Sequence, residues 1–150
     1  MSSAEPTIRR TTESILLVED NEDDIVLTRR ALARNNIGNP LLIARDGAEA
    51  LELLHGVEGA ASKPALVLLD LQLPKVDGLT VLKRIRSHPQ TKLTPVVVLT
   101  SSKAEQDVIA GYDLHANSYI RKPVDFDQFA EAVRQIGMYW LLLNEPPPST

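Results

Sequence analysis

Three short apolar runs divide the chain, at residues 15–18, 66–69 and 96–99. Each run is too short for a helix and is rich in branched side chains. Their apolarity is unbroken instead of alternating, which is typical of central strands that are covered on both faces in a parallel sheet. Residues 41–44 and 118–120 form two weaker runs that suit the edges of such a sheet. The pattern therefore predicts five strands.

Helical patterns lie between the predicted strands, and three of them have a recognisable start. In each, a residue typical of helix caps is followed three positions later by Glu or Gln: Asp46 with Glu49, Ser102 with Glu105, and Asp125 with Gln128. Such pairs resemble capping boxes, which satisfy the first free amides of a helix. Strands that alternate with helices imply right-handed crossovers and a doubly wound α/β domain.

The last helical pattern is the longest, and it carries an apolar seam at spacings of three and four residues. The seam consists of Phe126, Phe129, Val133, Ile136, Trp140 and Leu143. From residue 138 to 143, however, apolar side chains occupy every side of the helix. This segment either lies along a groove of its own domain or forms a homodimer interface, because a soluble monomer seldom exposes a large apolar patch. The candidate dimer contacts are Met138, Tyr139, Trp140, Leu141 and Leu142.

Length and composition are those of one globular domain with a buried core, at 150 residues and 43% hydrophobic positions. Residues 1–13 lack an apolar period and predict a flexible tail, residues 14–144 form the domain, and residues 145–150 form a proline-rich tail. The net charge of −4 argues against general nucleic-acid binding. The chain has no cysteine, no signal-peptide pattern and no apolar run near the ~18 residues of a membrane span. We therefore expect a cytoplasmic protein that contacts neither nucleic acid nor membrane.

The ends of the predicted strands carry the candidate chemistry. Glu19 and Asp20 follow the first strand, Asp70 the third and Thr100 the fourth, and Lys122 comes shortly after the fifth. In an open parallel sheet, ligands bind outside the carboxyl ends of the strands. Three carboxylates, a hydroxyl and an ammonium group should therefore converge at one edge.

Such a cluster of carboxylates has to be compensated. At an effective dielectric constant of 20, two carboxylates ~4 Å apart repel each other by about 4 kcal/mol. The cluster therefore either raises a pKa or recruits a cation, and a hard divalent ion such as Mg²⁺ suits a few carboxylates together with water and a phosphate. One carboxylate can then act as a nucleophile toward phosphorus, while the ion and Lys122 stabilise the charge on the transferred oxygens.

Four motifs resemble the receiver domains of bacterial response regulators. They are LLVEDN, LLDLQLPKVDG, VVVLTSS and SYIRKP, and the resemblance covers residues 14–136. It implies a flavodoxin-like sheet with the strand order 2-1-3-4-5. It also implies that Asp70 is the phospho-acceptor, that Asp20 binds Mg²⁺ directly, and that Glu19 holds the ion through water. The backbone carbonyl of Gln72 would supply a further ligand.

The resemblance assigns roles to the remaining motif residues as well. Thr100 matches the hydroxyl that bonds to the phosphoryl group, and Lys122 matches the lysine that pairs with it. The bond before Pro123 is expected to be cis, which helps to aim the lysine. Tyr119 matches the switch aromatic, which turns inward as Thr100 moves toward the phosphoryl group.

Other polar residues are given no chemistry. Glu22, Asp23 and Asp24 are interpreted as favourable charge on the first turn of a helix. Asp77 and Gly78 are interpreted as a turn or a helix entry. The three histidines, His55, His88 and His115, have no metal-ligand spacing, and surface roles are expected for them.

The expected function is a receiver that takes a phosphoryl group from a phosphohistidine of a sensor histidine kinase and catalyses only its own phosphorylation and dephosphorylation. The segment YWLLLNEPP resembles regulators that are paired with bacterial phytochromes. No chain beyond the receiver is left for a DNA-binding domain, so the signal is expected to leave through the receiver's own surface.

Four other functions compete with this one. A phosphatase with an aspartyl-phosphate intermediate would place a second aspartate where Gln72 stands, and the motifs of nucleotide-binding enzymes are missing. A phosphorylation-independent interaction module usually loses one of the site residues, whereas all are intact. An intermediate phosphate carrier in a multistep phosphorelay stays open.

Overall fold

The computed structural model describes residues 14–56 and 63–135, and in them five parallel strands form one sheet in the order β2-β1-β3-β4-β5. The strands are β1 Ile15–Val18, β2 Leu41–Ala44, β3 Leu66–Asp70, β4 Val96–Thr100 and β5 Ser118–Arg121. The predicted strands, their order and the edge positions of β2 and β5 are thus confirmed. The two longest strands, β3 and β4, extend one residue beyond the predicted runs and end on Asp70 and Thr100.

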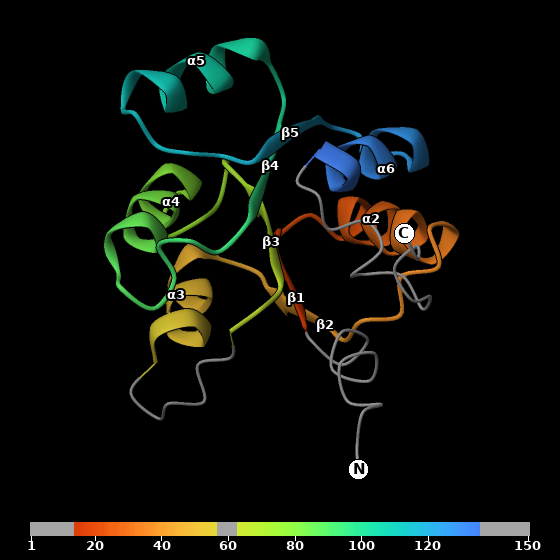
Figure 1. Ribbon diagram of the computed structural model, residues 1–150, viewed down its shortest axis with the longest axis horizontal. Coiled ribbons are helices and arrows are strands. Elements are labelled where there is room, and N and C mark those ends of the chain that lie inside the picture. The colour runs from red at the N-terminus through yellow and green to blue at the C-terminus, as the bar shows by residue number, and fades with distance from the viewer. Residues whose placement is uncertain (1–13, 57–62, 136–150) are drawn as a thin grey trace, which may run out of the picture.

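Helices cover both faces of the sheet, as Figure 1 shows. They are α2 Glu22–Arg34, α3 Gly47–His55, α4 Gly78–Ser87, α5 Lys103–Gly111 and α6 Phe126–Gln135. On one face α2 and α6 pack with Ile25, Phe129 and Val133 in one apolar cluster. On the other face α3, α4 and α5 contribute Leu54, Ile85 and Ile109 to a second cluster. Both faces of the central strands are therefore buried, as their unbroken apolarity predicts.

Two of the three predicted helix caps are present. The Asp46 carboxylate accepts a hydrogen bond from the Glu49 amide at 2.7 Å, and the Asp125 carboxylate accepts one from the Gln128 amide at 2.9 Å. Ser102 stands at the N-cap of α5, but its side chain makes no capping hydrogen bond, so this part of the prediction is wrong.

Two further helices have caps outside the capping-box pattern. Asn21 caps α2 by accepting from the Asp24 amide, and Asp77 caps α4 by accepting from the Thr80 amide. Asp77 is therefore a helix entry, one of the two roles considered for it. Neither cap is followed three positions later by Glu or Gln, so neither matches the capping-box pattern.

Part of the predicted seam on the last helix is confirmed and part is not. Phe129 and Val133 are fully buried, whereas Phe126 is 40% exposed. Phe126, the first residue of α6, lies beside α2, where it lines a groove together with Leu27 and Arg30. Residues 136–143 of the seam, with the candidate dimer contacts 138–142, lie outside the described residues.

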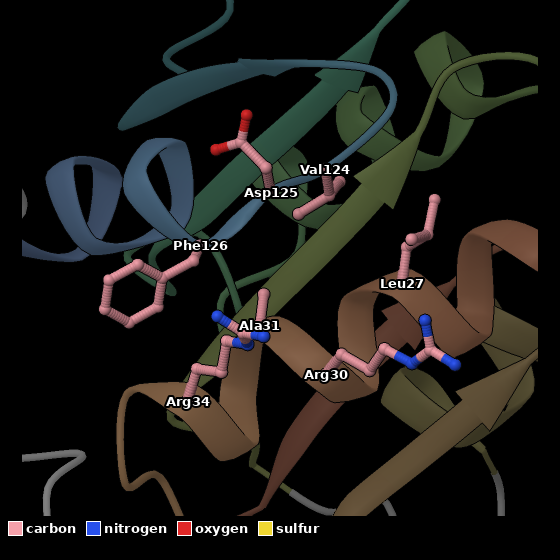
Figure 2. A pocket seen from close by; sticks show the side chains of 7 residues that line it. All are labelled: Leu27, Arg30, Ala31, Arg34, Val124, Asp125 and Phe126. Carbon is pink, nitrogen blue, oxygen red and sulfur yellow. The ribbon is translucent and has the colours of Figure 1, made fainter.

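The Phe126 ring lines a shallow groove of about 260 Å³ between α2 and the start of α6 (Figure 2). Its lining consists of Leu27, Arg30, Ala31, Arg34, Val124, Asp125 and Phe126. The groove has an apolar floor and two guanidinium groups, and none of its residues carries the predicted chemistry. Of the helices that the structure describes, none has the length and apolar content needed to span a membrane.

Candidate functional site

The predicted site residues do converge at the carboxyl ends of the strands. Asp70 ends β3, Thr100 ends β4 and Glu19 directly follows β1, and all three are buried. Asp20 lies beside them and is exposed. One carboxylate oxygen each from Glu19, Asp20 and Asp70 can be chosen so that all three lie within 4.8 Å of one another. The sheet order explains this, because β1 and β3 are neighbours and end at the same edge.

Lys122 reaches this cluster from the far side of β4. Its Nζ lies 3.2 Å from Asp70 Oδ2, 3.3 Å from Glu19 Oε2 and 3.0 Å from Asp24 Oδ2. Burial lowers the pKa of the ammonium group, but the three carboxylates outweigh it and raise the pKa above its ordinary value. Lys122 is therefore held in its charged form.

The backbone around Lys122 places the ammonium group. The Lys122 amide donates to the carbonyl of Thr100 at 2.8 Å, which continues the pairing of β5 with β4 beyond the strand end. The following peptide bond, between Lys122 and Pro123, is cis as expected.

Asp24 also belongs to the site, although the sequence pattern did not predict this. It was interpreted as charge on the first turn of α2, and it does lie there. Its carboxylate also makes the shortest of the three ion pairs of Lys122. The acidic run after Glu19 was the only signal, and the run alone does not tell which carboxylate faces the strand ends. That depends on which face of α2 packs on the sheet, and Ile25, Ala31 and Leu32 are the α2 residues in the core cluster.

The buried carboxylate of Glu19 is incompletely satisfied. Its Oε2 accepts from the Asn21 amide at 3.3 Å, while its Oε1 is buried and has no hydrogen-bond partner among the described residues. Burial, and then repulsion by Asp70, raise the pKa of Glu19 to about 7, although Lys122 and the Asn21 amide act in the opposite direction. A buried carboxylate oxygen without a partner normally requires compensation.

A divalent cation would supply that compensation. Three carboxylates gathered within 4.8 Å, one of them exposed, match the oxygen-rich ligand sets that hard divalent ions prefer. No other group of three metal-ligating side chains occurs in the described part of the chain. The donor set thus fits such an ion, and Asp20 offers it a route from solvent.

Thr100 and Gln72 complete the surroundings of Asp70. The Thr100 Oγ1 is buried and, within residues 14–56 and 63–135, has no hydrogen-bond partner. The Gln72 amide donates to Asp70 Oδ1 at 3.2 Å, so the two oxygens of Asp70 are held by different donors. The Gln72 side chain points elsewhere, because its amide group donates to Glu105 at 3.0 Å.

Tyr119 lies on β5 and is partly buried against the cluster on the α3, α4 and α5 face. Burial raises the pKa of its phenol group. In the parallel register it stands opposite Val98, two residues before Thr100 on the neighbouring strand. Its predicted role as a switch is not tested by this arrangement and stays a prediction.

The histidines lie outside the site. The rings of His55 and His88 stack with centroids 3.9 Å apart, and His55 Nε2 lies 2.9 Å from Thr91 Oγ1. His115 is exposed. None of the three belongs to the metal-ligating group described above.

Fold and site together define a doubly wound α/β domain with a cluster of three carboxylates at the carboxyl ends of its strands. Residues 15–134 match the family of the response regulator receiver domain, so the chain belongs to that family. The predicted resemblance is confirmed over nearly the same residues.

Three relatives are similar over most of the chain. Response regulator Rcp1 of Synechocystis sp. is 43% identical over 85% of this chain and 88% of Rcp1. The structure of the Mn²⁺-bound form of Rcp1 has a TM-score of 0.69 and 39% identity, covering 91% of this chain and 99% of that structure. The bacteriophytochrome response regulator RtBRR has a TM-score of 0.81 and 48% identity, covering 91% of this chain and 85% of RtBRR. The phosphorylated cyanobacterial phytochrome response regulator RcpA has a TM-score of 0.70 and 45% identity, covering 87% of this chain and 94% of RcpA.

Proposed function

We propose that this chain is a response regulator that accepts a phosphoryl group on Asp70 from a phosphohistidine of a sensor histidine kinase. The observation that carries the proposal is the setting of Asp70. It is a buried carboxylate held between the Lys122 ammonium and the Gln72 amide, beside two further carboxylates. That RcpA is described as phosphorylated supports the same chemistry.

In the transfer, a carboxylate oxygen of Asp70 forms a bond to phosphorus while the bond between phosphorus and the histidine nitrogen breaks. The imidazole leaves with the electron pair, and a mixed anhydride remains on Asp70. Lys122 offsets the negative charge on the phosphoryl oxygens, and the Thr100 hydroxyl, which makes no hydrogen bond to any described residue, can donate to one of them.

The proposed metal is Mg²⁺, held by Asp20, by Asp70, by Glu19 through water and by the backbone carbonyl of Gln72. Bound there, the ion would neutralise charge on the pocket and on the transferred group. The Mn²⁺-bound Rcp1 structure supports a divalent ion of this kind. Because Glu19 has a pKa raised to about 7, proton release should accompany metal binding near neutral pH.

The phosphoryl group adds about −1.5 to −2 charge at the strand ends. In the proposed response, Thr100 moves toward this charge and Tyr119 turns inward, so that the surface formed by β4, α5, β5 and α6 changes between two states. The signal leaves through that surface of the receiver, in the cytoplasm. Passing the phosphoryl group on to a second protein in a phosphorelay is the alternative use of the same intermediate.

The central test is phosphotransfer to Asp70→Asn with Mg²⁺ and a labelled kinase. We expect complete loss of label, because an amide cannot act as the nucleophile. Asp107→Asn is the matched control, since it removes the same charge from an exposed residue of α5, and it should be labelled like the parent chain. Labelling of Asp70→Asn at the parental rate would contradict the assignment of Asp70, whereas a parent chain that takes no label would favour an interaction module.

The proposed kinase is a bacterial phytochrome, as the printed descriptions of RtBRR and RcpA suggest for those relatives. Phosphotransfer from a phytochrome kinase should be at least tenfold faster than from a histidine kinase with an unrelated sensor. Equal rates from both would contradict the phytochrome pairing and leave the chemistry at Asp70 unaffected.

We also propose a homodimer through Met138, Tyr139, Trp140, Leu141 and Leu142. Replacing Trp140 and Leu142 with Glu should convert a dimer into a monomer by sedimentation, before and after phosphorylation. A parent chain that is monomeric in both states would contradict this interface.

A further inference from the structure

A polar link joins two loops at the edge of the site. Glu105, in the first turn of α5, uses both carboxylate oxygens for it. Oε1 accepts from the Ser101 amide at 2.7 Å, and Oε2 accepts from the side-chain amide of Gln72 at 3.0 Å. Glu105 thus connects the β3–α4 loop with the β4–α5 loop, and we call this link the Glu105 clasp.

Both ends of the Glu105 clasp lie next to the residues that carry the chemistry. Gln72 holds Asp70 Oδ1 through its backbone amide and Glu105 through its side chain. Ser101 directly follows Thr100, and its carbonyl accepts from Arg121 Nε at 3.2 Å. The peptide group after Thr100 is therefore held by Glu105 on one side, while Arg121 holds the next carbonyl from β5.

One of the two loops is held firmly without the clasp. The Gly78 amide donates to the Leu71 carbonyl at 3.0 Å, which closes the β3–α4 loop on itself. A Cβ at Gly78 would lie 2.3 Å from the Asp70 carbonyl oxygen, so only glycine permits this close approach. The backbone of Gln72 has little freedom to move away from Asp70.

The other loop depends more on the clasp. Of the α5 side chains whose surroundings the structure describes, Ile109 alone is buried. The N-cap Ser102 contributes no side-chain hydrogen bond. Segments with few buried apolar contacts open most easily. Glu105 is therefore the main polar attachment of the start of α5 to the edge of the site.

We infer that Glu105 is a positioning residue that lengthens the life of the phosphoryl group on Asp70 by keeping the β4–α5 loop against the β3–α4 loop. This inference rests on the proposed function. Loss of the group requires a water oxygen to bond to phosphorus while the bond to Asp70 breaks. Asp70 then leaves as a carboxylate, inorganic phosphate is released, and the water proton passes to solvent.

The physical basis is access of water to phosphorus. Asp70 is only 3% exposed with the clasp closed. Opening the clasp frees the backbone beside Thr100 and parts the loop from the Gln72 side chain. Water should then reach the phosphoryl group more often, and Thr100 should hold it less well.

The experiment loads the full chain with phosphoryl groups from acetyl phosphate and Mg²⁺, removes the donor, and follows the decay of label. We expect Glu105→Ala and Gln72→Ala each to shorten the half-life about three- to tenfold, which is the range for the net loss of one ordinary hydrogen bond. The double variant should decay no faster than the faster single variant, because both lose the same link.

Two further variants separate positioning from folding. In Glu105→Gln, the side-chain carbonyl can accept from Ser101 and its amide can donate to the Gln72 oxygen once that amide flips. Its half-life should lie within about twofold of the parent value, a rescue that the bond count predicts. Asp107→Asn on the exposed side of the same helix should leave the half-life unchanged.

Thermal unfolding of each variant shows whether the fold is intact. The inference would be overturned if the label on Glu105→Ala decayed with the parental half-life, or if the effects of the two single variants added in the double variant. Either outcome would leave Asp70 as the acceptor. A parent chain that takes no label from acetyl phosphate or a kinase would overturn the proposed function and this inference together.

Discussion

Two partly buried cations lie at opposite ends of the strands, and their surroundings differ. We call the side of the sheet where the strands begin the amino edge and the side where they end the carboxyl edge. Arg86, near the amino ends of β4 and β5, donates to the carbonyl groups of His115, Lys92 and Thr94 and to Asn117 Oδ1, at 2.7–3.2 Å. Burial lowers the pKa of its guanidinium, and all four acceptors are neutral. Lys122, at the carboxyl ends, contacts three carboxylates instead.

The amino edge and the carboxyl edge therefore have different roles. At the amino edge the Arg86 guanidinium donates to four neutral acceptors, and these hydrogen bonds connect the chain segments that lead into β4 and β5. At the carboxyl edge negative charge is in excess, and the Glu19 and Thr100 oxygens have no partner among the described residues. Complete hydrogen bonding at the amino edge stabilises the fold, whereas the incompletely bonded oxygens at the carboxyl edge are available to bind a ligand.

Removing Arg86 should have the largest effect on stability. We expect Arg86→Met to lower the free energy of unfolding by about 2–3 kcal/mol, because several acceptors lose a charged donor. Arg84→Met is the matched control, since Arg84 is exposed on the same helix and its side chain makes none of these bonds. Urea unfolding measures both, and a loss below that of Arg84→Met would show that the amino edge does not hold the fold.

Removing the charge of Glu19 should act in the opposite direction. The unfolded chain loses the Glu19 proton near pH 4.5, whereas the folded chain keeps it up to about pH 7. The folded state binds the Glu19 proton more tightly in this window, so the contribution of Glu19 to the stability of the metal-free chain falls as pH rises from 4.5 to 7.

We therefore expect Glu19→Gln to stabilise the metal-free chain by about 1–2 kcal/mol at pH 8 and to change little at pH 4. Added Mg²⁺ should stabilise the parent chain more than the variant. Urea unfolding with EDTA or Mg²⁺ measures both effects. A destabilised variant at pH 8 without metal would contradict the assigned excess of charge at this edge.

Two buried threonines extend the comparison to uncharged groups. Thr91, near the amino edge, donates to the Ile85 carbonyl at 2.9 Å, whereas the hydroxyl of Thr100, at the carboxyl edge, has no partner in the part of the chain that the structure describes. Thr91→Val should cost about 1 kcal/mol in unfolding free energy, and Thr100→Val should stay within about 0.5 kcal/mol of the parent chain. Chemical denaturation distinguishes them, and equal costs would remove the difference between the edges.

The smallest effect concerns pH at the amino edge. Burial, and then the charges of His88 and Arg84, lower the pKa of His55. The unfolded chain therefore takes up a proton first as pH falls below 6.5, and stability contributed by neutral His55 is lost as pH falls through its lowered pKa.

His55→Gln should reduce this loss of stability at acid pH, whereas His115→Gln, at an exposed position, should not. Denaturant midpoints between pH 7.5 and 5 measure the effect, best in the Glu19→Gln background, where the opposing titration is absent. Identical pH profiles for the two histidine variants would argue against a role for the His55–His88 pair.

The sheet and the main members of the site could be predicted because they depend on local pattern and on one geometric rule. Unbroken apolar runs specify buried parallel strands, and parallel strands end at the same edge, so Glu19, Asp70 and Thr100 had to meet. The resemblance added the cis bond at Pro123, which the structure contains.

The tertiary structure alone decided what the helices and loops bring to this edge. Asp24, in the first turn of the helix that Asn21 caps, reaches Lys122. Ser102 does not cap α5, and Glu105 turns instead to the Ser101 amide and the Gln72 side chain. Such contacts join residues whose spacing carries no period, and they depend on the angle and depth at which each helix packs on the sheet. The sequence alone therefore determined the strands and the reacting groups, while packing determined which side chains hold those groups in place.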